Sequence, residues 1–360
     1  MTPGAERRAL LVGSLPADDE AQAMAHALDL LGPALDAVPD GEIGERSEQF
    51  PGGNRSAWTA IIGSICRADT ASWRVVREGE TNELGWSTDY DTGTRLAPRR
   101  RPSDMAAHLD LGWNRFARQS YPEFDRLRSE ANRPDLRFQV GLPTALGMTF
   151  TIMSPVNALR YAGAFNERLA WEANDILDHL GGENVRFQLE VPGELALAYR
   201  TRGRALGIAL RTVLGLANQI RPEAPFGIHL CFGDLNNKAL ITQPSLVPAV
   251  RFTNELVRRW PTTHQLDYIH VPLAEADLAP TTDPAWYAPL AELDLPADCR
   301  LVAGFVHDRL DDDGHDQLLS MLDDLVGRPV DVASSCGLGR RDRATADSLL
   351  RQTARLAGLS

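Results

Sequence analysis

A histidine and a cysteine two residues apart end one of the apolar segments of this chain. They are His229 and Cys231, in the segment Phe226-Gly-Ile-His-Leu-Cys-Phe-Gly233. Side chains two apart in a β-strand point to the same side, so the imidazole and the thiol would leave the strand end together. Neutral imidazole and thiolate are the ligands that zinc prefers. A further thiol, Cys336, lies in Val332-Ala-Ser-Ser-Cys-Gly-Leu-Gly-Arg340, and we expect the fold to bring it to the other two.

Polar residues end or follow other apolar segments, and these are candidates for substrate binding. They are Ser14, Asp40, Glu42 and Glu190. A carboxylate as deep in an apolar strand as Glu190 needs a partner or a cationic ligand group. A substrate ammonium would serve, and so would a structural arginine, either Arg186 or Arg200.

Two further patterns have both a functional and a structural interpretation. His307 and Asp308 follow another apolar segment, and imidazole is suited to acid–base work because it titrates near neutral pH. The alternative is a histidine held by structural bonds. Three tryptophans could stack on a flat substrate, although packing in the interior is the better expectation for them. They are Trp73, Trp86 and Trp113.

The segments that must position these residues alternate with longer helical patterns. We expect strands over residues 9–14, 35–40, 136–141, 185–190, 226–233, 266–271, 300–306 and 329–334. Helices are expected over 18–31, 103–132, 155–180, 201–219, 245–260 and 343–356. This alternation predicts an α/β fold with a parallel sheet. Eight such units favour a closed (β/α)8 TIM barrel, with an open doubly wound sheet as the alternative. In a barrel, functional groups lie at the C-terminal ends of the strands, where the candidate residues fall.

The composition is that of an ordinary globular protein. The chain has 360 residues, of which 43% are hydrophobic and 24% charged. We expect one domain over residues 1–360. A polar stretch at about 50–101, after the second strand, is too long for a simple connection and is interpreted as an elaborated insertion.

Charge and cysteine content exclude several classes of partner. The net charge is −12 and no long basic run is present, which argues against nucleic acid. No apolar run approaches the roughly 20 residues of a membrane span. The run from Ala9 to Val12 is too short for a signal-peptide core, so we expect a cytoplasmic protein. Four cysteines in such a chain indicate free or metal-bound thiols rather than disulfides.

These motifs together resemble the catalytic barrel of the cobalamin-independent methionine synthases, which belong with the uroporphyrinogen decarboxylase-like barrels. In that family, a strand ending in His-x-Cys and a late Cys-Gly-Leu segment supply zinc ligands. The matching residues here are His229, Cys231 and Cys336. The resemblance implies that these three residues bind zinc. The family's fourth ligand is a Glu after the sixth strand, and this chain has His270-Val-Pro272 there. His270, Glu275, a water or the substrate would then complete the site.

Three shorter motifs extend the resemblance along the chain. Gly13-Ser-Leu-Pro16 is similar to a segment that contacts the carboxylate of the thiol substrate in the family, which implies this role for Ser14. Asp40-Gly-Glu42 and Glu190-Val-Pro192 are similar to segments that contact the substrate amino group. The resemblance therefore assigns the ammonium of an amino-acid thiol to Glu42 and Glu190.

The function that the resemblance implies is zinc-dependent methyl or alkyl transfer to a thiol of the homocysteine type. The partners would be a small-molecule thiol and an alkyl donor. A lyase that opens an epoxide with a thiol, a decarboxylase and a metal-free binding protein are the alternatives. The sequence leaves the donor, the acceptor thiol and the oligomeric state open.

Overall fold

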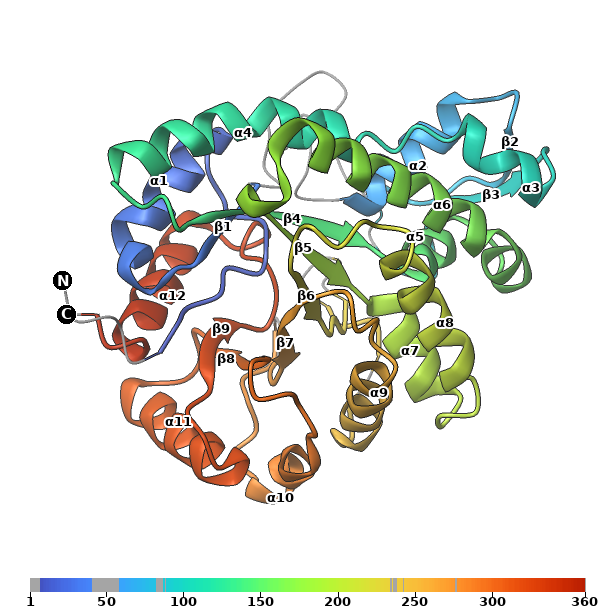
Figure 1. Cartoon of the computed structure of the whole chain (residues 1–360). Coiled ribbons are helices and arrows are strands. Elements are labelled where there is room, and N and C mark those ends of the chain that lie inside the picture. Colours follow the sequence, from blue (N-terminus) through green and yellow to red (C-terminus); the bar gives the residue numbers. More distant parts are fainter. Residues whose placement is uncertain are drawn as a thin grey trace.

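The computed structural model describes residues 7–40, 58–81, 87, 89–233, 235, 238–241, 243–275 and 277–359, without the side chains of residues 59 and 60. Seven described strands form one parallel sheet in the order β1-β4-β5-β6-β7-β8-β9. They are β1 (Ala37–Pro39), β4 (Arg137–Pro143), β5 (Val185–Glu190), β6 (Phe226–His229), β7 (Leu266–Pro272), β8 (Arg300–Val306) and β9 (Asp331–Ser334). Figure 1 shows the sheet curled on itself, with its two edges facing each other.

The prediction of eight strands is wrong for the first segment, residues 9–14. Ala9 forms a single parallel bridge with Val332 of β9, and its N–H donates to the oxygen of Ala34 at 3.1 Å. The segment thus runs between the two edges of the sheet without a continuous ladder on either side. The structure is an α/β fold with a curled, seven-stranded parallel sheet, and the hydrogen-bonded barrel is not closed.

Side-chain amides from inside the curled sheet bind the main chain of residues 9–14, which lacks a continuous ladder. Gln139 of β4 donates to the oxygen of Leu11 at 2.8 Å, and Gln188 of β5 donates to the oxygen of Val12 at 2.6 Å. A buried carbonyl needs a donor, and here side chains that project from two strands supply it. The hydroxyl of Tyr268 donates to Gln188 at 2.7 Å, which completes a polar layer inside the sheet.

Helices surround the outer face of the curled sheet (Figure 1). The main ones are α1 (Glu20–Leu31), α4 (Trp113–Glu130), α5 (Ala145–Ile152), α6 (Pro155–Leu180), α7 (Pro192–Arg200), α8 (Leu206–Ala217), α9 (Val247–Arg258), α11 (Asp312–Val326) and α12 (Arg343–Leu356). The other helical segments are α2 (Trp58–Ala68), α3 (Pro102–Met105), α10 (Pro284–Tyr287), η1 (Gly32–Ala34), η2 (Ala106–His108), η3 (Gly182–Asn184) and η4 (Ala288–Glu292). None of the helices in the described ranges is long and apolar enough to cross a membrane.

The expected helix over 103–132 is interrupted before α4. Gly112 has φ 90°, a left-handed conformation that suits glycine and cannot continue a helix. The carboxylate of Glu172, from α6, accepts the N–H groups of Leu111 and Trp113 at 2.8 Å each. This buried carboxylate caps the start of α4 and fixes the break in position.

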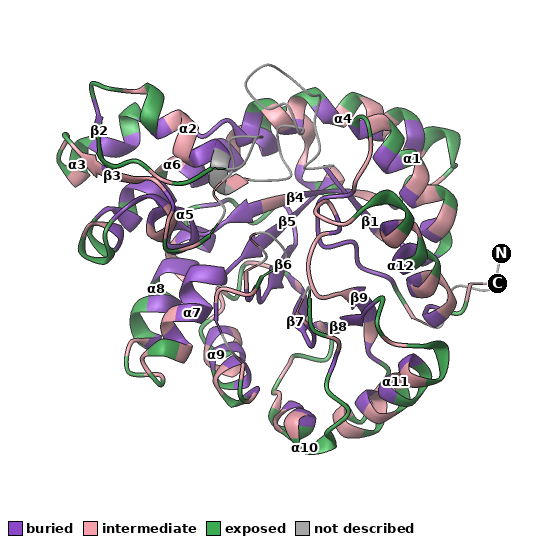
Figure 2. Ribbon diagram, turned by 180° about the vertical axis from the view of Figure 1, so that it is seen from behind, coloured by how far each residue is buried: buried purple, intermediate pink, exposed green. Residues whose placement is uncertain are grey.

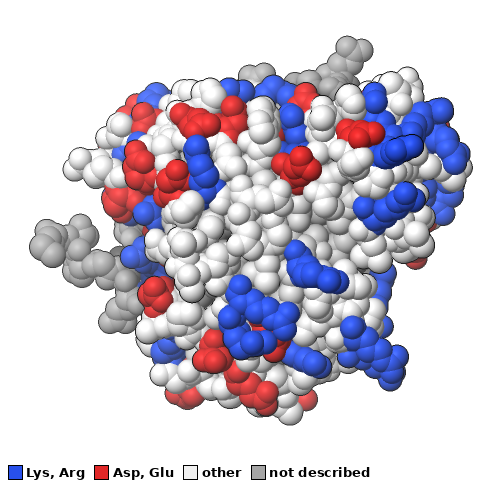
Figure 3. All heavy atoms as spheres, turned by 45° about the vertical axis from the view of Figure 1, so that its right-hand side comes forward, with Lys and Arg blue, Asp and Glu red and all other residues white. Residues whose placement is uncertain are grey.

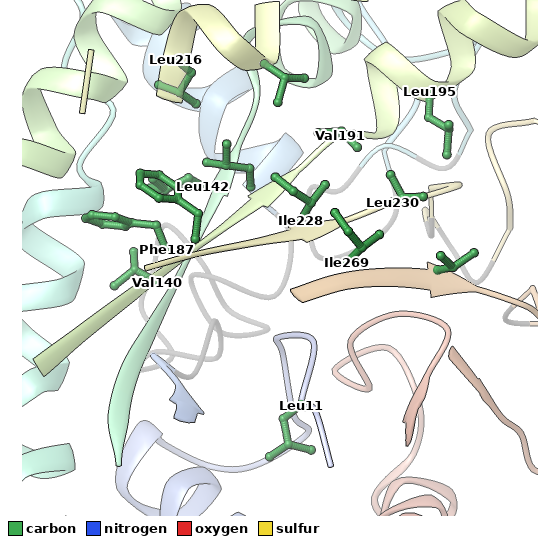
Figure 4. Packing of buried hydrophobic residues seen from close by; sticks show 14 of the residues in the cluster. Leu11, Val140, Leu142, Phe187, Val191, Leu195, Leu216, Ile228, Leu230 and Ile269 are labelled. Atoms are coloured by element: carbon green, nitrogen blue, oxygen red, sulfur yellow. The ribbon is translucent and has the colours of Figure 1, made fainter. Parts of the chain in front are cut away.

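The core lies mainly between the sheet and its helices. Figure 4 shows Val140, Leu142, Phe187, Ile228 and Ile269 of adjacent strands packing in one layer toward the helices. Strands covered on both faces are typical of parallel sheets, and Figure 2 shows the strands buried while the helices expose their outer sides. A smaller cluster fills the inside of the curl. Its members are Leu10, Val12, Tyr268, Val302 and Ala333.

The described part of the expected insertion contains α2 and a separate antiparallel pair, β2 (Trp73–Arg77) and β3 (Arg95–Pro98). Trp73 is buried against Phe165, with ring centroids 6.2 Å apart. Trp113 is also buried, and its indole N–H donates to the oxygen of Gly141 at 2.7 Å. Both tryptophans therefore pack, and Trp86 lies outside the described residues.

In Figure 3 basic and acidic side chains are interspersed with wide uncharged areas.

Candidate metal centre

Three side chains from the C-terminal ends of two strands that are distant in sequence, β6 and β9, lie close together. His229 is the last residue of β6, Cys231 follows two residues later, and Cys336 lies two residues after β9. Their potential ligand atoms all lie within 4.8 Å of one another. Sγ of Cys336 is 3.8 Å from Nε2 of His229. The curl of the sheet brings β9 back toward β6, so residues about a hundred positions apart become neighbours. We call these three residues the ligand cluster.

The chemistry of the ligand cluster fits zinc. Two thiols and one imidazole are the donors of known zinc sites, in which thiols bind as thiolates. The pKa of Cys231 is lowered well below its usual value, mainly by the hydrogen bond with Cys336. Burial opposes that shift, while His229 and the N–H of Gly233, which lies 3.3 Å from the sulfur, support it. Cys231 is therefore prepared to bind as a thiolate.

The other two cysteines have the opposite environment. Cys66 and Cys299 are free and buried among apolar groups. Burial raises the pKa of Cys66 far above its usual range and that of Cys299 to about 12. Both thiols thus stay protonated and behave as small core side chains.

His270 of β7 is a contact of the ligand cluster that the sequence interpretation considered only as a fourth metal ligand. Its Nδ1 lies 2.7 Å from Nδ1 of His229, and its Nε2 lies 3.1 Å from the main-chain oxygen of Ser334. Burial and the neighbouring His229 lower the pKa of His270 well below its usual value. Both ring nitrogens are thus engaged within the protein, so His270 is not available as a ligand. Its position opposite His229 in the β6–β7 register is the signal that could have identified this contact.

The cluster of described His, Cys, Asp and Glu side chains has three members, so a zinc ion held by them would keep a fourth position for water or substrate. Glu275, the other candidate considered for that position, is not one of them. Its main-chain oxygen instead lies 3.1 Å from Nε2 of His307. An open fourth position is the property that separates catalytic zinc sites from structural ones.

Ser14 lies beside the loop that carries Cys336. It is buried, its hydroxyl accepts the N–H of Gly339 at 3.2 Å, and its main-chain oxygen accepts the N–H of Leu338 at 2.6 Å. A Cβ on Gly337 would come within 2.7 Å of the Ser14 hydroxyl, so this close approach requires glycine. Both segments line one pocket, and Ser14 and Cys336 are among its lining residues.

Glu190 ends β5 and pairs in register with His229 of β6. It is 7% exposed, and one of its oxygens is 3.4 Å from the amide nitrogen of Gln188. Neither arginine considered as its structural partner is directed to it. Arg186 forms ion pairs at the other end of the strand, and Arg200 donates to the oxygen of Leu240. Neither Arg186 nor Arg200 is therefore the structural partner of Glu190.

The other predicted site residues have different outcomes. Asp40 directly follows β1 and is buried, with its N–H donating to the oxygen of Gln139 at 2.8 Å. Asp40 thus lies at the C-terminal end of its strand, as Glu190 does. Glu42, the second candidate contact for an ammonium group, lies outside the described residues.

His307 and Asp308 follow β8, but their bonds are structural. Nε2 of His307 contacts the oxygen of Glu275, and its Nδ1 accepts the N–H of Arg309 at 3.1 Å. Asp308 lies 3.3 Å from Arg341, which joins the loops after β8 and β9. These contacts favour a supporting role for the pair, and their acid–base role stays a prediction.

The buried carboxyl of Glu194 lies near the C-terminal ends of β4 and β5, and the sequence interpretation missed it. It accepts the hydroxyl of Thr144 at 2.5 Å and the N–H of Leu146 at 3.2 Å. Burial raises its pKa to about 7. The carboxyl joins the segments after β4 and β5. The motif Pro192-Gly-Glu194 directly after a predicted strand end was the available signal.

Comparison with known proteins gives a likeness at the level of structure. No protein-family model matches this chain, and no curated protein matches it. The chain is similar to the solved structure of a B12-independent methionine synthase from Shewanella sp. W3-18-1 in complex with selenomethionine. That likeness has a TM-score of 0.55 at 13% identity and covers 98% of this chain and 96% of that one.

A second solved structure, from Listeria monocytogenes, is provisionally described as a vitamin-B12-independent methionine synthase. It is 13% identical, with a TM-score of 0.41 over 66% of this chain and 68% of that one. The likeness to the Shewanella protein extends over nearly the whole of both chains. This chain therefore has a methionine synthase-like fold.

Proposed function

We propose that this protein is a zinc-dependent methyl- or alkyltransferase that acts on a small-molecule thiol. The observation that carries the proposal is the ligand cluster, in which three soft donors lie within 4.8 Å of one another at the C-terminal ends of the strands. Active sites of barrel folds lie at that end. The methionine synthase-like fold supports the same class of reaction.

The metal would supply the activation of the thiol. A free thiol has a pKa of about 8.5, so little thiolate exists at neutral pH. Zinc held by His229, Cys231 and Cys336 would lower the pKa of a substrate thiol at the open position. The ligand cluster itself contributes Cys231, whose lowered pKa favours the form that binds.

The neighbouring polar residues define the rest of the substrate. Glu190, in register with His229, would bind an ammonium group. Ser14 would bind a carboxylate, because its hydroxyl accepts the N–H of Gly339 and still has its own proton to donate. A substrate with an ammonium, a carboxylate and a thiol is an amino-acid thiol of the homocysteine type. Asp40 and Glu42 are proposed as further contacts of its ammonium group.

We also propose that residues 9–14 complete a single (β/α)8-type domain over residues 1–360. The bridge at Ala9 and the bonds from Gln139 and Gln188 support this role, because they hold the segment between β9 and β1. The segment also carries Ser14 to the cluster, so its position serves the site.

Metal analysis of the purified protein tests the function. We expect about one equivalent of zinc, and less than about a tenth of an equivalent without gain on adding zinc would overturn the proposal, since a catalytic site of this kind needs its metal. The variant Cys231→Ser should lose the metal. Cys299→Ser is the matched control, because Cys299 is a buried free thiol outside the cluster.

Product analysis separates the remaining alternatives. With homocysteine and a panel of methyl donors, mass spectrometry should detect a thioether that carries the donor's methyl group. An opened epoxide would indicate the lyase, and loss of CO2 would indicate the decarboxylase. A metal-free binding protein predicts unchanged ligand binding in both Cys231→Ser and Cys336→Ser.

A further inference from the structure

We propose that His270 is a positioning residue that sets the tautomer of His229 and thereby directs the lone pair of Nε2 toward the metal. The inference rests on the proposed function, since it assigns a role at the same site. Ligating histidines generally donate their second ring N–H to a carboxylate, a carbonyl or a water. In this protein a second histidine takes that place.

The hydrogen bonds fix the protons one after another. The main-chain oxygen of Ser334 can only accept, so Nε2 of His270, 3.1 Å away, carries a proton. A neutral His270 then has a lone pair on Nδ1. Nδ1 of His229 lies 2.7 Å from that lone pair and must donate to it. In a neutral His229, Nε2 is then left unprotonated, on the side where Sγ of Cys336 lies 3.8 Å away.

The opposite arrangement would need a doubly protonated His270. Its side chain is fully buried, and burial disfavours the charged form of an imidazole. A metal dication at the ligand cluster would repel that charge further. The neutral form, with one proton on Nε2, is therefore the form compatible with metal binding.

The ring of His270 is also held by packing. A Cβ on Gly304, in the adjacent strand β8, would come within 2.5 Å of its Nε2, so the imidazole occupies the space of that missing side chain. The centroids of the His229 and His270 rings are 4.8 Å apart. Ser334 ends β9, two residues before Cys336. The hydrogen bonds of His270 thus connect the end of β6, which carries His229, with the end of β9, which precedes Cys336.

The first test uses the metal-free protein. Nitrogen-15 NMR of the histidine rings reports which nitrogen carries the proton, with the His229 signals assigned by their loss in His229→Asn. We expect the proton of His229 on Nδ1 and that of His270 on Nε2. A His229 ring that carries its proton on Nε2 and none on Nδ1 would overturn the inference, and this measurement needs neither metal nor a variant of His270.

The second test is zinc affinity, measured by competition with a chromophoric chelator. His270→Leu, which removes the acceptor, should weaken zinc binding about 10- to 100-fold, the range for lost outer partners of metal ligands. His270→Asn is the conservative variant. Its Oδ1 can accept the N–H of His229 from nearly the position of Nδ1, so it should retain most of the affinity.

His264→Leu is the matched control. His264 also contacts a main-chain oxygen, that of Ile220 at 2.9 Å, but it precedes β7 at the other end of the strand. It should bind zinc like the wild type. Wild-type affinity in His270→Leu, or equal losses in His270→Leu and His270→Asn, would overturn the inference. Wild-type protein that takes up no zinc would instead overturn the proposed function, and the tautomer measurement would still decide the role of His270.

Discussion

The two ends of the curled sheet use the same strands for different purposes. At the N-terminal ends, Arg186 of β5 pairs with Asp36 at 2.8 Å and with Asp267 of β7 at 2.5 Å. Arg300 of β8 pairs with Asp36 at 2.7 Å and with Asp331 of β9 at 2.6 Å. Opposite charges alternate there around the buried Arg186, and each group has a partner of the other sign. We call these five residues the charge network.

At the C-terminal ends, chemically similar groups converge instead of opposite charges. Two thiols and two imidazoles lie side by side in the cluster and its His270 contact. Burial favours the neutral form of a thiol, yet the pKa of Cys231 is lowered there. The charge network stabilises the fold without a ligand, whereas the ligand cluster is an arrangement that a bound cation would complete. The comparison thus places the paired charges at one end of the sheet and the potential metal ligands at the other.

Removing the central cation of the charge network should have the largest effect. Arg186→Met leaves Asp36 and Asp267 with the partly exposed Arg300 and, for Asp36, also Arg8 as cations. The loss should therefore lie toward the low end of the about 3–5 kcal/mol that is typical of a broken buried pair. Urea unfolding of the metal-free protein measures this loss. A loss below about 1 kcal/mol, within the range of surface substitutions, would contradict the assigned role of the network.

Removing a ligand at the other end should leave the fold almost unchanged. Cys336→Ser should weaken zinc binding more than about a hundredfold, because loss of outer partners alone already costs up to that factor. The unfolding free energy of the metal-free protein should change by less than about 1 kcal/mol, since Cys336 is only partly buried. Chelator competition and urea unfolding, measured on the same preparation, check both parts. A large loss of stability would break the proposed separation of roles.

The charge network also predicts a pH dependence. Burial alone would raise the pKa of Asp36, but the hydrogen bond and charge of Arg186, with Arg300, hold it well below the usual value. A lowered pKa in the folded state contributes stability above the unfolded value of about 4, and that contribution is lost as pH falls through the folded pKa. Asp36→Asn should therefore be less stable than wild type by about 2 kcal/mol at pH 7. The difference should shrink in acid, and a difference that grows on acidification would contradict this sign.

The smallest expected effect is spectroscopic. Because the pKa of Cys231 is lowered, the metal-free protein should show thiolate absorbance in the ultraviolet at neutral pH. The absorbance should disappear in Cys231→Ser and persist in Cys66→Ser, whose thiol has a raised pKa. Absence of a thiolate signal until about pH 8.5, the ordinary thiol value, would contradict the electrostatics of the ligand cluster.

Much of the architecture was predictable because its signals are local. Seven of the eight expected strands form, and the helices over 155–180 and 343–356 have the observed bounds. Periodicity identifies such elements from neighbouring residues alone. The first segment, residues 9–14, was different. Its apolar residues predict a strand, but whether they join a ladder depends on how far the two sheet edges stay apart and on amides from β4 and β5.

The sequence by itself determined the types of ligand and their places at strand ends, as with His229 and Cys231, because side-chain direction in a strand follows from spacing. Only the tertiary structure decided the neighbours. It brought Cys336 to β6, directed Arg186 away from Glu190, and placed His270 between His229 and Ser334. These pairings depend on sheet curl and on the register between strands. Both are collective properties of the packed chain, and no short segment encodes them.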